Sequence, residues 1–350
     1  MNNIFILGIT GVNGGIESLM KSLAFDLLEN EKTYAVNIVT SFSSIAFEEE
    51  YMAKGVKIIT IPFRQQRREY KEKLRILLSS AKRGDIVYLN VSSYCNWTLF
   101  ELVKKLNCKV IIHGHNSYTK NWAKKIIHLI GRIKYRKIGK KIAVSKECNN
   151  FMFGGKGDFV IPNGIVSARF KFNLNDRIKV RSELCVGKYD LVIGCVGRIL
   201  KEKNQISLIS HAKKYSDIVF VFVGAFTNYN YEKKIKKIAP QNCIFVGQTD
   251  NVGYYLSGFD ALCVPSKREA YPLAVIEGIT NGLNVVCNKK LYKKLPVDIK
   301  ENENISVYDE DVLKSSLASW NGFRNDGEIP FDESFDIKVF LAKTRRIINE

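Results

Sequence analysis

Two glutamates lie eight residues apart in the segment 266-SKREAYPLAVIEG-278, with a proline between them. Pro272 suits the first turn of a helix, so the sequence predicts a helix that begins near this residue. Glu269 would then lie in the loop before the helix and Glu277 on its second turn, with free backbone N–H groups between them. Carboxylates accept hydrogen bonds from sugar hydroxyls and a helix N-terminus binds phosphate, so the segment suits a ligand with a sugar, a diphosphate and a ribose.

Two cations upstream could hold the same diphosphate. The segment 192-VIGCVGRILKEKNQ-205 predicts a strand that ends at Gly197 and is followed by Arg198 and Lys203. Cations just beyond a strand end can clamp a diphosphate and neutralise the charge that builds as it leaves. Taken alone, each of the two cations is more typical of an exposed surface, and it is the glutamates downstream that favour a binding role.

A glycine-rich turn near the N-terminus is a second candidate phosphate site. In 4-IFILGITGVNGGIESLMKSL-23 a strand leads into a helix from about Ile16, and Gly14 and Gly15 would let the backbone approach a ligand. The spacing fits neither the dinucleotide fingerprint G-x-G-x-x-G nor the P-loop. An ordinary tight turn between strand and helix explains the glycines about as well.

Two histidines follow a buried strand in 109-KVIIHGHNSYTK-120. A histidine at the carboxyl end of a parallel strand faces the ligand-binding edge of the sheet, where His113 could bond to a substrate hydroxyl or assist proton transfer. His115 could equally cap the loop. Zinc is the rival hypothesis, but the pair lacks an obvious third ligand, so we expect no metal site.

The elements that must position these residues are short apolar runs that alternate with amphipathic helical stretches. Most runs are continuously apolar, which is typical of parallel strands buried on both faces. The predicted strands are 4–9, 35–40, 57–61, 85–89, 109–113, 140–144, 158–161, 190–196, 217–223, 243–246, 260–264, 284–287 and 304–307. The series breaks at a polar stretch, 162–184. The sequence therefore predicts an α/β protein with two doubly wound, Rossmann-like domains and a cleft between them. We place the first domain at 1–165, the second at 166–335 and a last helix at 336–350.

The composition is typical of a soluble protein with 350 residues, 46% hydrophobic and 25% charged. Its apolar runs are too short to span a bilayer, and the N-terminus has neither a charged leader region nor a cleavage site. The eight cysteines have no C-x-x-C spacing and several lie in apolar runs, so we expect reduced thiols in a cytoplasmic protein.

The positive charge is concentrated in the first half of the chain. Residues 1–166 hold 26 Lys and Arg against 13 Asp and Glu, which leaves them +13 of the total of +19. An anionic partner is therefore expected: a nucleic acid, a membrane surface or a phosphorylated substrate. Nucleic acid is the least favoured, because the chain has no recognised nucleic-acid-binding motif and no strand that alternates aromatic and basic residues.

One segment, 120-KNWAKKIIHLIGRIKYRKIGKK-141, combines nine Lys or Arg with no acidic residue. Its apolar residues recur at helical spacing, so it predicts a basic amphipathic helix. Such a helix either packs its apolar stripe on the sheet of its own domain or lies on an anionic membrane. For the second case the candidate membrane residues are Trp122, Lys124, Lys125, Arg132, Lys134 and Arg136.

These segments together resemble the nucleotide-sugar-dependent glycosyltransferase family 4, which has the two-domain GT-B fold. The resemblance is carried, in the family's order, by GVNGGIE at 11–17, IIHGHNS at 111–117, IAVSKE at 142–147, VIPNGI at 160–165, VGRILKEKN at 196–204, FVGQTDNV at 245–252 and the glutamate pair. The residue after Glu269 is Ala270 where the family usually has glycine, and Val166 replaces the usual aspartate after N-G-I. Neither change removes a catalytic group, so we expect an active enzyme.

The resemblance implies roles for individual residues. Arg198 and Lys203 would hold the donor phosphates, Glu269 the donor sugar and Glu277 the ribose. The glycine loop would close over the diphosphate, His113 would line the reaction centre, and the last helix would cross back to the first domain. The catalytic candidates are thus His113, Glu269, Arg198 and Lys203. The full set of donor-binding candidates is Gly14, Gly15, Gly197, Arg198, Lys203, Gly247, Gln248, Glu269, Ala270, Pro272, Leu273 and Glu277.

The implied reaction is a retaining transfer, without metal or other cofactor, from a UDP- or GDP-linked sugar to a hydroxyl of a saccharide acceptor. The basic first domain favours a lipid-linked acceptor and a peripheral position on the inner face of the cell membrane, and the reaction would belong to surface polysaccharide synthesis. A nucleotide-sugar epimerase of the same architecture is the alternative, and a nucleic-acid-binding protein is a more distant one.

Overall fold

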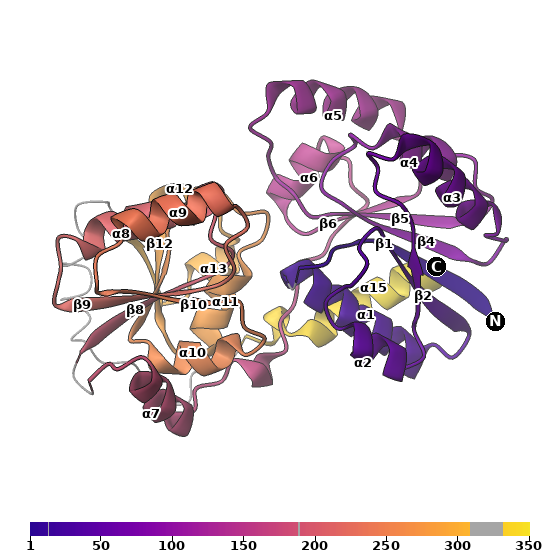
Figure 1. Cartoon of the computed structure of the whole chain (residues 1–350). Coiled ribbons are helices and arrows are strands. Elements are labelled where there is room, and N and C mark those ends of the chain that lie inside the picture. The colour runs from indigo at the N-terminus through magenta and orange to yellow at the C-terminus, as the bar shows by residue number, and fades with distance from the viewer. Residues whose placement is uncertain (13, 188–189, 309–331) are drawn as a thin grey trace. The chain divides into compact units, whose positions relative to one another are not determined.

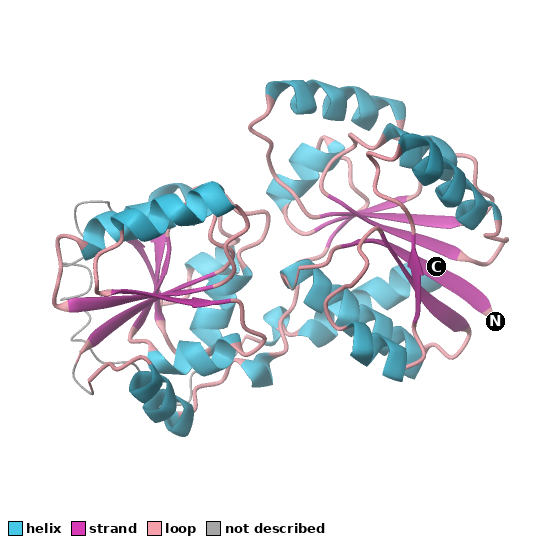
Figure 2. Ribbon diagram, in the orientation of Figure 1, coloured by secondary structure: helices cyan, strands magenta, loops and turns pink. Residues whose placement is uncertain are grey.

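The computed structural model describes residues 1–12, 14–187, 190–308 and 332–350, which divide into two units. Unit 1 comprises Met1–Gly164 and Ile337–Glu350, and unit 2 comprises Ile165–Asp336. Figure 1 labels the elements, and Figure 2 shows a sheet flanked by helices in each unit. No helix in the described ranges is long and apolar enough to cross a membrane.

Within its described residues, unit 1 contains one parallel sheet of seven strands, in the order β3-β2-β1-β4-β5-β6-β7. The strands are β1 (Asn2–Ile9), β2 (Tyr34–Thr40), β3 (Lys57–Thr60), β4 (Ile86–Val91), β5 (Lys109–Gly114), β6 (Lys140–Ala143) and β7 (Phe159–Val160). The helices are α1 (Gly15–Asn30), α2 (Glu48–Ala53), α3 (Arg67–Ser79), α4 (Trp97–Val103), α5 (Trp122–Lys134), α6 (Lys146–Phe153) and α15 (Ile337–Asn349). Helices α1, α2 and α15 cover one face of the sheet, and α3 to α6 lie on the other (Figure 1).

The described residues of unit 2 form a parallel sheet of six strands, in the order β10-β9-β8-β11-β12-β13. The strands are β8 (Leu191–Val196), β9 (Ile218–Val223), β10 (Cys243–Gly247), β11 (Ala261–Val264), β12 (Asn284–Asn288) and β13 (Ile305–Tyr308). The helices are α7 (Leu174–Glu183), α8 (Gln205–Ala212), α9 (Tyr229–Ile238), α10 (Val252–Gly258), α11 (Leu273–Thr280), α12 (Lys289–Tyr292) and α13 (Val297–Lys300). The predicted fold, two doubly wound α/β domains, is confirmed, and each predicted strand agrees with an observed one to within two residues.

The C-terminal helix α15 is part of the core of unit 1. Phe340 is 1% exposed and packs in the apolar cluster that includes Leu23 of α1. The C-terminal part of α15 is also bound by polar contacts, since Lys109 Nζ donates to the Ile348 carbonyl at 2.9 Å and Arg345 pairs with Asp26 at 3.1 Å. Unit 1 is therefore built from both ends of the chain.

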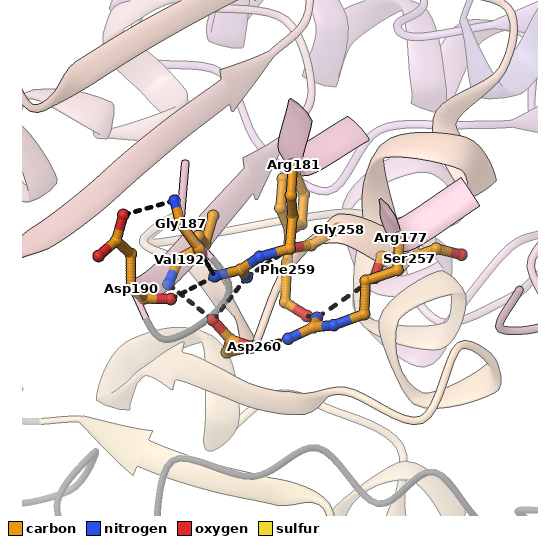
Figure 3. Close-up of polar contacts among 9 residues, drawn as sticks. All are labelled: Arg177, Arg181, Gly187, Asp190, Val192, Ser257, Gly258, Phe259 and Asp260. Carbon is orange, nitrogen blue, oxygen red and sulfur yellow. Dashed lines mark hydrogen bonds and ion pairs between the residues drawn. The ribbon is translucent and has the colours of Figure 1, made fainter. Parts of the chain in front are cut away.

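A buried ion cluster connects α7 to the sheet of unit 2 (Figure 3). The carboxylate of Asp260, just before β11, pairs with Arg177 at 2.6 Å and with Arg181 at 3.2 Å. It also accepts the backbone N–H of Val192 in β8 at 2.8 Å. The polar stretch that breaks the strand pattern in the sequence thus supplies the two arginines that compensate a carboxylate that is 8% exposed.

Candidate active site

The strand order of unit 2 reverses between β8 and β11, which are hydrogen-bonded neighbours. In a doubly wound sheet the loops at the carboxyl ends of two such strands diverge and leave a binding crevice. The loop after β8 carries Arg198 and Lys203, and the loop after β11 carries Glu269. The fold therefore brings the predicted cations and the first glutamate to one edge of one sheet.

An ion pair joins these two loops. Lys203 Nζ lies 2.7 Å from Glu269 Oε1, and the two side chains are 29% and 14% exposed. Lys203 ends a single 3₁₀ turn, and Asn204 follows it in the left-handed region at φ 60°. The Asn204 side chain donates to the Pro265 carbonyl at 3.3 Å, which fixes the turn against the end of β11. The lysine is thus positioned from both sides of the switch point.

Glu277 lies on α11, which begins at Leu273, one residue after the predicted start, with Pro272 as its N-cap. Burial raises the pKa of the Glu277 carboxyl to about 7, and the positive charges of Lys203 and Arg169 act against that shift. Lys203 therefore acts electrostatically on Glu277 while it is hydrogen-bonded to Glu269. Lys203, Glu269 and Glu277, which the sequence predicted to bind a sugar nucleotide, are thus linked electrostatically. Arg169 also acts on Glu277, and the sequence did not indicate it.

Two glycines at strand ends of unit 2 keep the backbone open. Gly197 after β8 has φ +127°, and a Cβ there would meet nothing nearer than Lys203 Nζ at 3.9 Å. Gly247 at the end of β10 has φ +87° and no heavy atom within 4 Å of the Cβ position. Residues other than glycine rarely adopt such φ values. Both positions leave room for a ligand to approach the main chain.

The remaining donor-binding candidates of unit 2 lie in the same loops. Arg198 is exposed, and its carbonyl accepts a hydrogen bond of 2.9 Å from Gln205 Nε2. Gln248 is exposed, Ala270 and Leu273 are partly buried, and Pro272 is buried. Their contacts with a donor stay predictions.

In unit 1 the glycine loop is braced by a carboxylate that the sequence analysis missed. Gly14 is the N-cap of α1 and Gly15 its first residue. Glu17, which is 6% exposed, accepts hydrogen bonds from the Thr10 hydroxyl at 2.5 Å and the Thr10 N–H at 3.3 Å. A Cβ on Gly14 would lie 2.9 Å from Glu17 Oε2. A side chain at position 14 would thus displace the Glu17 carboxylate, whereas the predicted phosphate contact of Gly14 and Gly15 stays a prediction.

The structure covers His113, which the strand pattern predicted to face the ligand-binding edge of the sheet. His113 is 0% exposed, its Nδ1 lies 2.9 Å from the Tyr88 hydroxyl, and its ring stacks on Phe340 of α15. Burial, and to a lesser extent His115, lower the pKa of His113 well below its ordinary value, so the ring is neutral. Phe340 is distant in sequence, and for that reason the strand pattern gave no sign that this ring is covered.

His115 is the histidine of the pair that has exposed surface. Its Nε2 lies 2.9 Å from Asn90 Oδ1, and its ring centroid lies 4.0 Å from that of His113. Burial lowers its pKa to about 3. A direct substrate contact by His113 stays a prediction, and in this structure His115 is the more accessible candidate for it. The described residues contain no group of three or more His, Cys, Asp or Glu that could hold a metal ion.

Comparison with known proteins found a family match in the second half of the chain. Residues 176–318 match the family of glycosyl transferases group 1, and the matched segment contains Arg198, Lys203, Glu269 and Glu277. This match supports a glycosyltransferase of the group 1 type. It covers most of unit 2, whereas unit 1 lies outside it.

Three relatives extend the comparison. The "Putative glycosyltransferase EpsF" of Bacillus subtilis (strain 168) is 20% identical over 89% of this chain and 87% of its own length. The UDP-Gal:alpha-D-GlcNAc-diphosphoundecaprenol alpha-1,3-galactosyltransferase of Escherichia coli is 28% identical over 35% of this chain and 34% of its own. The crystal structure of HepE from Anabaena, in complex with UDP and glucose, superposes with a TM-score of 0.80 at 16% identity, over 99% of each chain. This last likeness establishes a shared fold.

Proposed function

We propose that this protein is a retaining, family 4-type glycosyltransferase that moves a hexosyl group from a nucleoside diphosphate donor to a hydroxyl of a lipid-linked saccharide in surface polysaccharide synthesis. The proposal rests above all on the Lys203–Glu269 pair at the switch point of unit 2, with Glu277 in the same electrostatic cluster. Cation, carboxylate and helix N-terminus are the groups that a sugar diphosphate requires, and they lie where doubly wound sheets bind ligands.

The ion pair suggests how donor binding and activation are coupled. An incoming diphosphate competes with Glu269 for the ammonium group of Lys203, because a diphosphate carries more negative charge than a single carboxylate. Once Lys203 turns to the diphosphate, the Glu269 carboxylate is released to accept hydrogen bonds from hydroxyls of the donor sugar. Arg198 and the N-terminus of α11 then add positive potential where the leaving diphosphate gains charge.

The proposed chemistry needs no enzymic nucleophile. The bond between the anomeric carbon and the diphosphate oxygen breaks, and a bond from the acceptor oxygen forms on the same face. The leaving diphosphate oxygen accepts the acceptor proton, and the cations stabilise its charge. The test is the anomeric configuration of the product by ¹H NMR. An α-linked donor is expected to give an α-linked product, and a β-linked product would refute retention. Donor remodelling without acceptor would instead indicate an epimerase.

The relatives support a uridine donor and a lipid acceptor. HepE was crystallised with UDP and with UDP-glucose, and the name of the Escherichia coli enzyme gives UDP-Gal as donor and a diphosphoundecaprenol-linked sugar as acceptor. We therefore infer that UDP is the nucleotide of choice over GDP, and that unit 1 works at the surface of an anionic membrane that carries the acceptor.

Nucleotide affinity is expected to fall as the pH decreases through about 7, where the Glu277 carboxyl gains a proton. The protonated group loses acceptor capacity toward the ribose hydroxyls, so affinity should drop by roughly tenfold per pH unit below that value. Calorimetric titration with UDP at a series of pH values tests this. Glu277→Gln supplies the baseline, because UDP itself titrates in the same range. Parallel pH profiles for the wild type and the variant would contradict a role for Glu277 ionisation.

A further inference from the structure

Helix α5 exposes its apolar stripe to solvent. Trp122 is 75% exposed, Ile126 48%, Ile130 48% and Ile133 63%. Residues spaced by three, four and eight positions share one face of a helix, so these side chains form a continuous strip along α5. Figure 1 shows the helix on the outside of unit 1. Of the two alternatives for this stripe, packing of these four side chains on the sheet of unit 1 is therefore not observed.

The opposite face of α5 attaches it to unit 1 through a polar residue and a small one. His128 is 0% exposed, and its Nδ1 accepts the Tyr94 N–H at 3.0 Å while its Nε2 lies 3.0 Å from the Phe151 carbonyl oxygen. A Cβ on Gly131 would meet the Tyr94 carbonyl oxygen at 2.6 Å, so only glycine permits this approach. A soluble helix normally has its apolar stripe toward the core, and α5 has the reverse orientation.

The surroundings of the strip are positively charged. Lys124 and Lys125 are exposed in the first turn of α5. Among the predicted membrane residues, Arg132 donates to the carbonyl of Phe151 at 3.0 Å and Lys134 pairs with Glu101 at 2.6 Å, so these two also serve the fold. A second copy of this face would bring like charges together, whereas anionic headgroups would compensate them.

A pocket of about 480 Å³ lies at the C-terminal end of the strip. Its walls are partly apolar, with Ile133 of the strip among them, and they also carry Lys104, Arg136 and Lys137. None of the lining residues, which all belong to the described ranges, is acidic. A pocket lined by both apolar side chains and cations has the chemistry of a site for a phosphate joined to an alkyl chain.

We propose that α5 lies in the interface of an anionic bilayer, with the Trp122–Ile133 strip in the acyl boundary and a lipid headgroup phosphate in the basic pocket. The inference deepens the proposed function, because it would hold unit 1 at the surface that carries a lipid-linked acceptor. Vesicle binding tests the membrane inference independently of donor binding and sugar transfer. The membrane inference can therefore fail while the proposed function holds.

The first experiment is co-sedimentation of the full chain with phosphatidylcholine vesicles, with and without phosphatidylglycerol. Binding is expected only where the anionic lipid is present. Ile126→Ser/Ile130→Ser should lower the partition coefficient by roughly 100-fold, since each isoleucine withdraws apolar surface from water. Leu174→Ser/Ile178→Ser on α7 is the matched control, because those side chains are 59% and 61% exposed but lie in unit 2. It should bind like the wild type.

The second experiment locates the helix and the headgroup. Lipids brominated near the top of the acyl chain should quench tryptophan fluorescence, and Trp122→Phe should abolish that quenching. Lys104→Gln/Arg136→Gln/Lys137→Gln should cost about tenfold in affinity for phosphatidylglycerol vesicles and reduce the salt dependence. Glutamine substitutions at the exposed Lys171, Lys213 and Lys214 of unit 2 provide the charge-matched control.

Three results would overturn the proposal. The first is a wild-type protein that binds neither kind of vesicle. The second is an isoleucine variant that binds as well as the wild type. The third is a wild-type dimer, detected by analytical ultracentrifugation, that is absent in the isoleucine variant. That result would make the strip a protein interface. Titration of every variant with UDP shows whether unit 2 is intact. Absence of UDP binding in the wild type would count against the proposed function and leave the vesicle results to decide the membrane face.

Discussion

Lys203→Ala is expected to lower kcat/KM for sugar transfer by about 10²–10³, because it removes a cation that stabilises the leaving diphosphate. The variant also removes the ion pair of 2.7 Å between Lys203 and Glu269, so the negative charge of the carboxylate would repel the diphosphate more strongly. Steady-state kinetics with UDP-sugar donors measure the effect. Lys201→Ala is the matched control, since Lys201 lies in the same 3₁₀ turn with an exposed side chain. It should stay within about twofold of the wild type.

Folding and chemistry can be separated at this position. The Lys203–Glu269 pair is partly exposed, so its loss should cost no more than about 1 kcal/mol of unfolding free energy. Lys203→Arg keeps the charge and should recover part of the lost activity, although the guanidinium has a different shape. Equal activity of Lys203→Ala and Lys201→Ala would show that Lys203 has no special role.

Asp260→Ala is expected to destabilise unit 2 by about 3–5 kcal/mol, because it leaves Arg181 as a buried charge without its carboxylate. Figure 3 shows that both arginines of α7 converge on this one side chain. Urea denaturation, followed by circular dichroism and by loss of UDP binding, measures the change. Glu232→Ala removes a surface pair with Lys236 that is 2.7 Å long, and it should cost less than about 0.5 kcal/mol. Equal midpoints for the two variants would contradict the role assigned to the cluster.

The strands and the grouping of the candidate donor-binding residues were predictable because both are encoded by local patterns. Most strands of the two parallel sheets are short apolar runs, and the Glu269–Glu277 spacing follows from one loop and one helix start. The switch point then places residues 198–203 and 269 together, because neighbouring parallel strands end at the same edge.

The features that escaped prediction depend on contacts distant in sequence. A helical stripe tells which residues of α5 share a face, but not that His128 and Gly131 attach the opposite face to unit 1. His113 is covered by Phe340, more than two hundred residues later, and Asp260 is compensated by arginines from α7. Periodicity carries no information on such pairings.

The most direct test of the donor site in unit 2 is calorimetric titration of the purified protein with UDP, GDP and ADP in the absence of metal. We predict that UDP binds in preference to the other two and that Arg198→Ala and Glu277→Ala each abolish or strongly weaken this binding. If no nucleotide binds, or if both variants bind UDP as the wild type does, the cluster around Lys203 is not a nucleotide-sugar site.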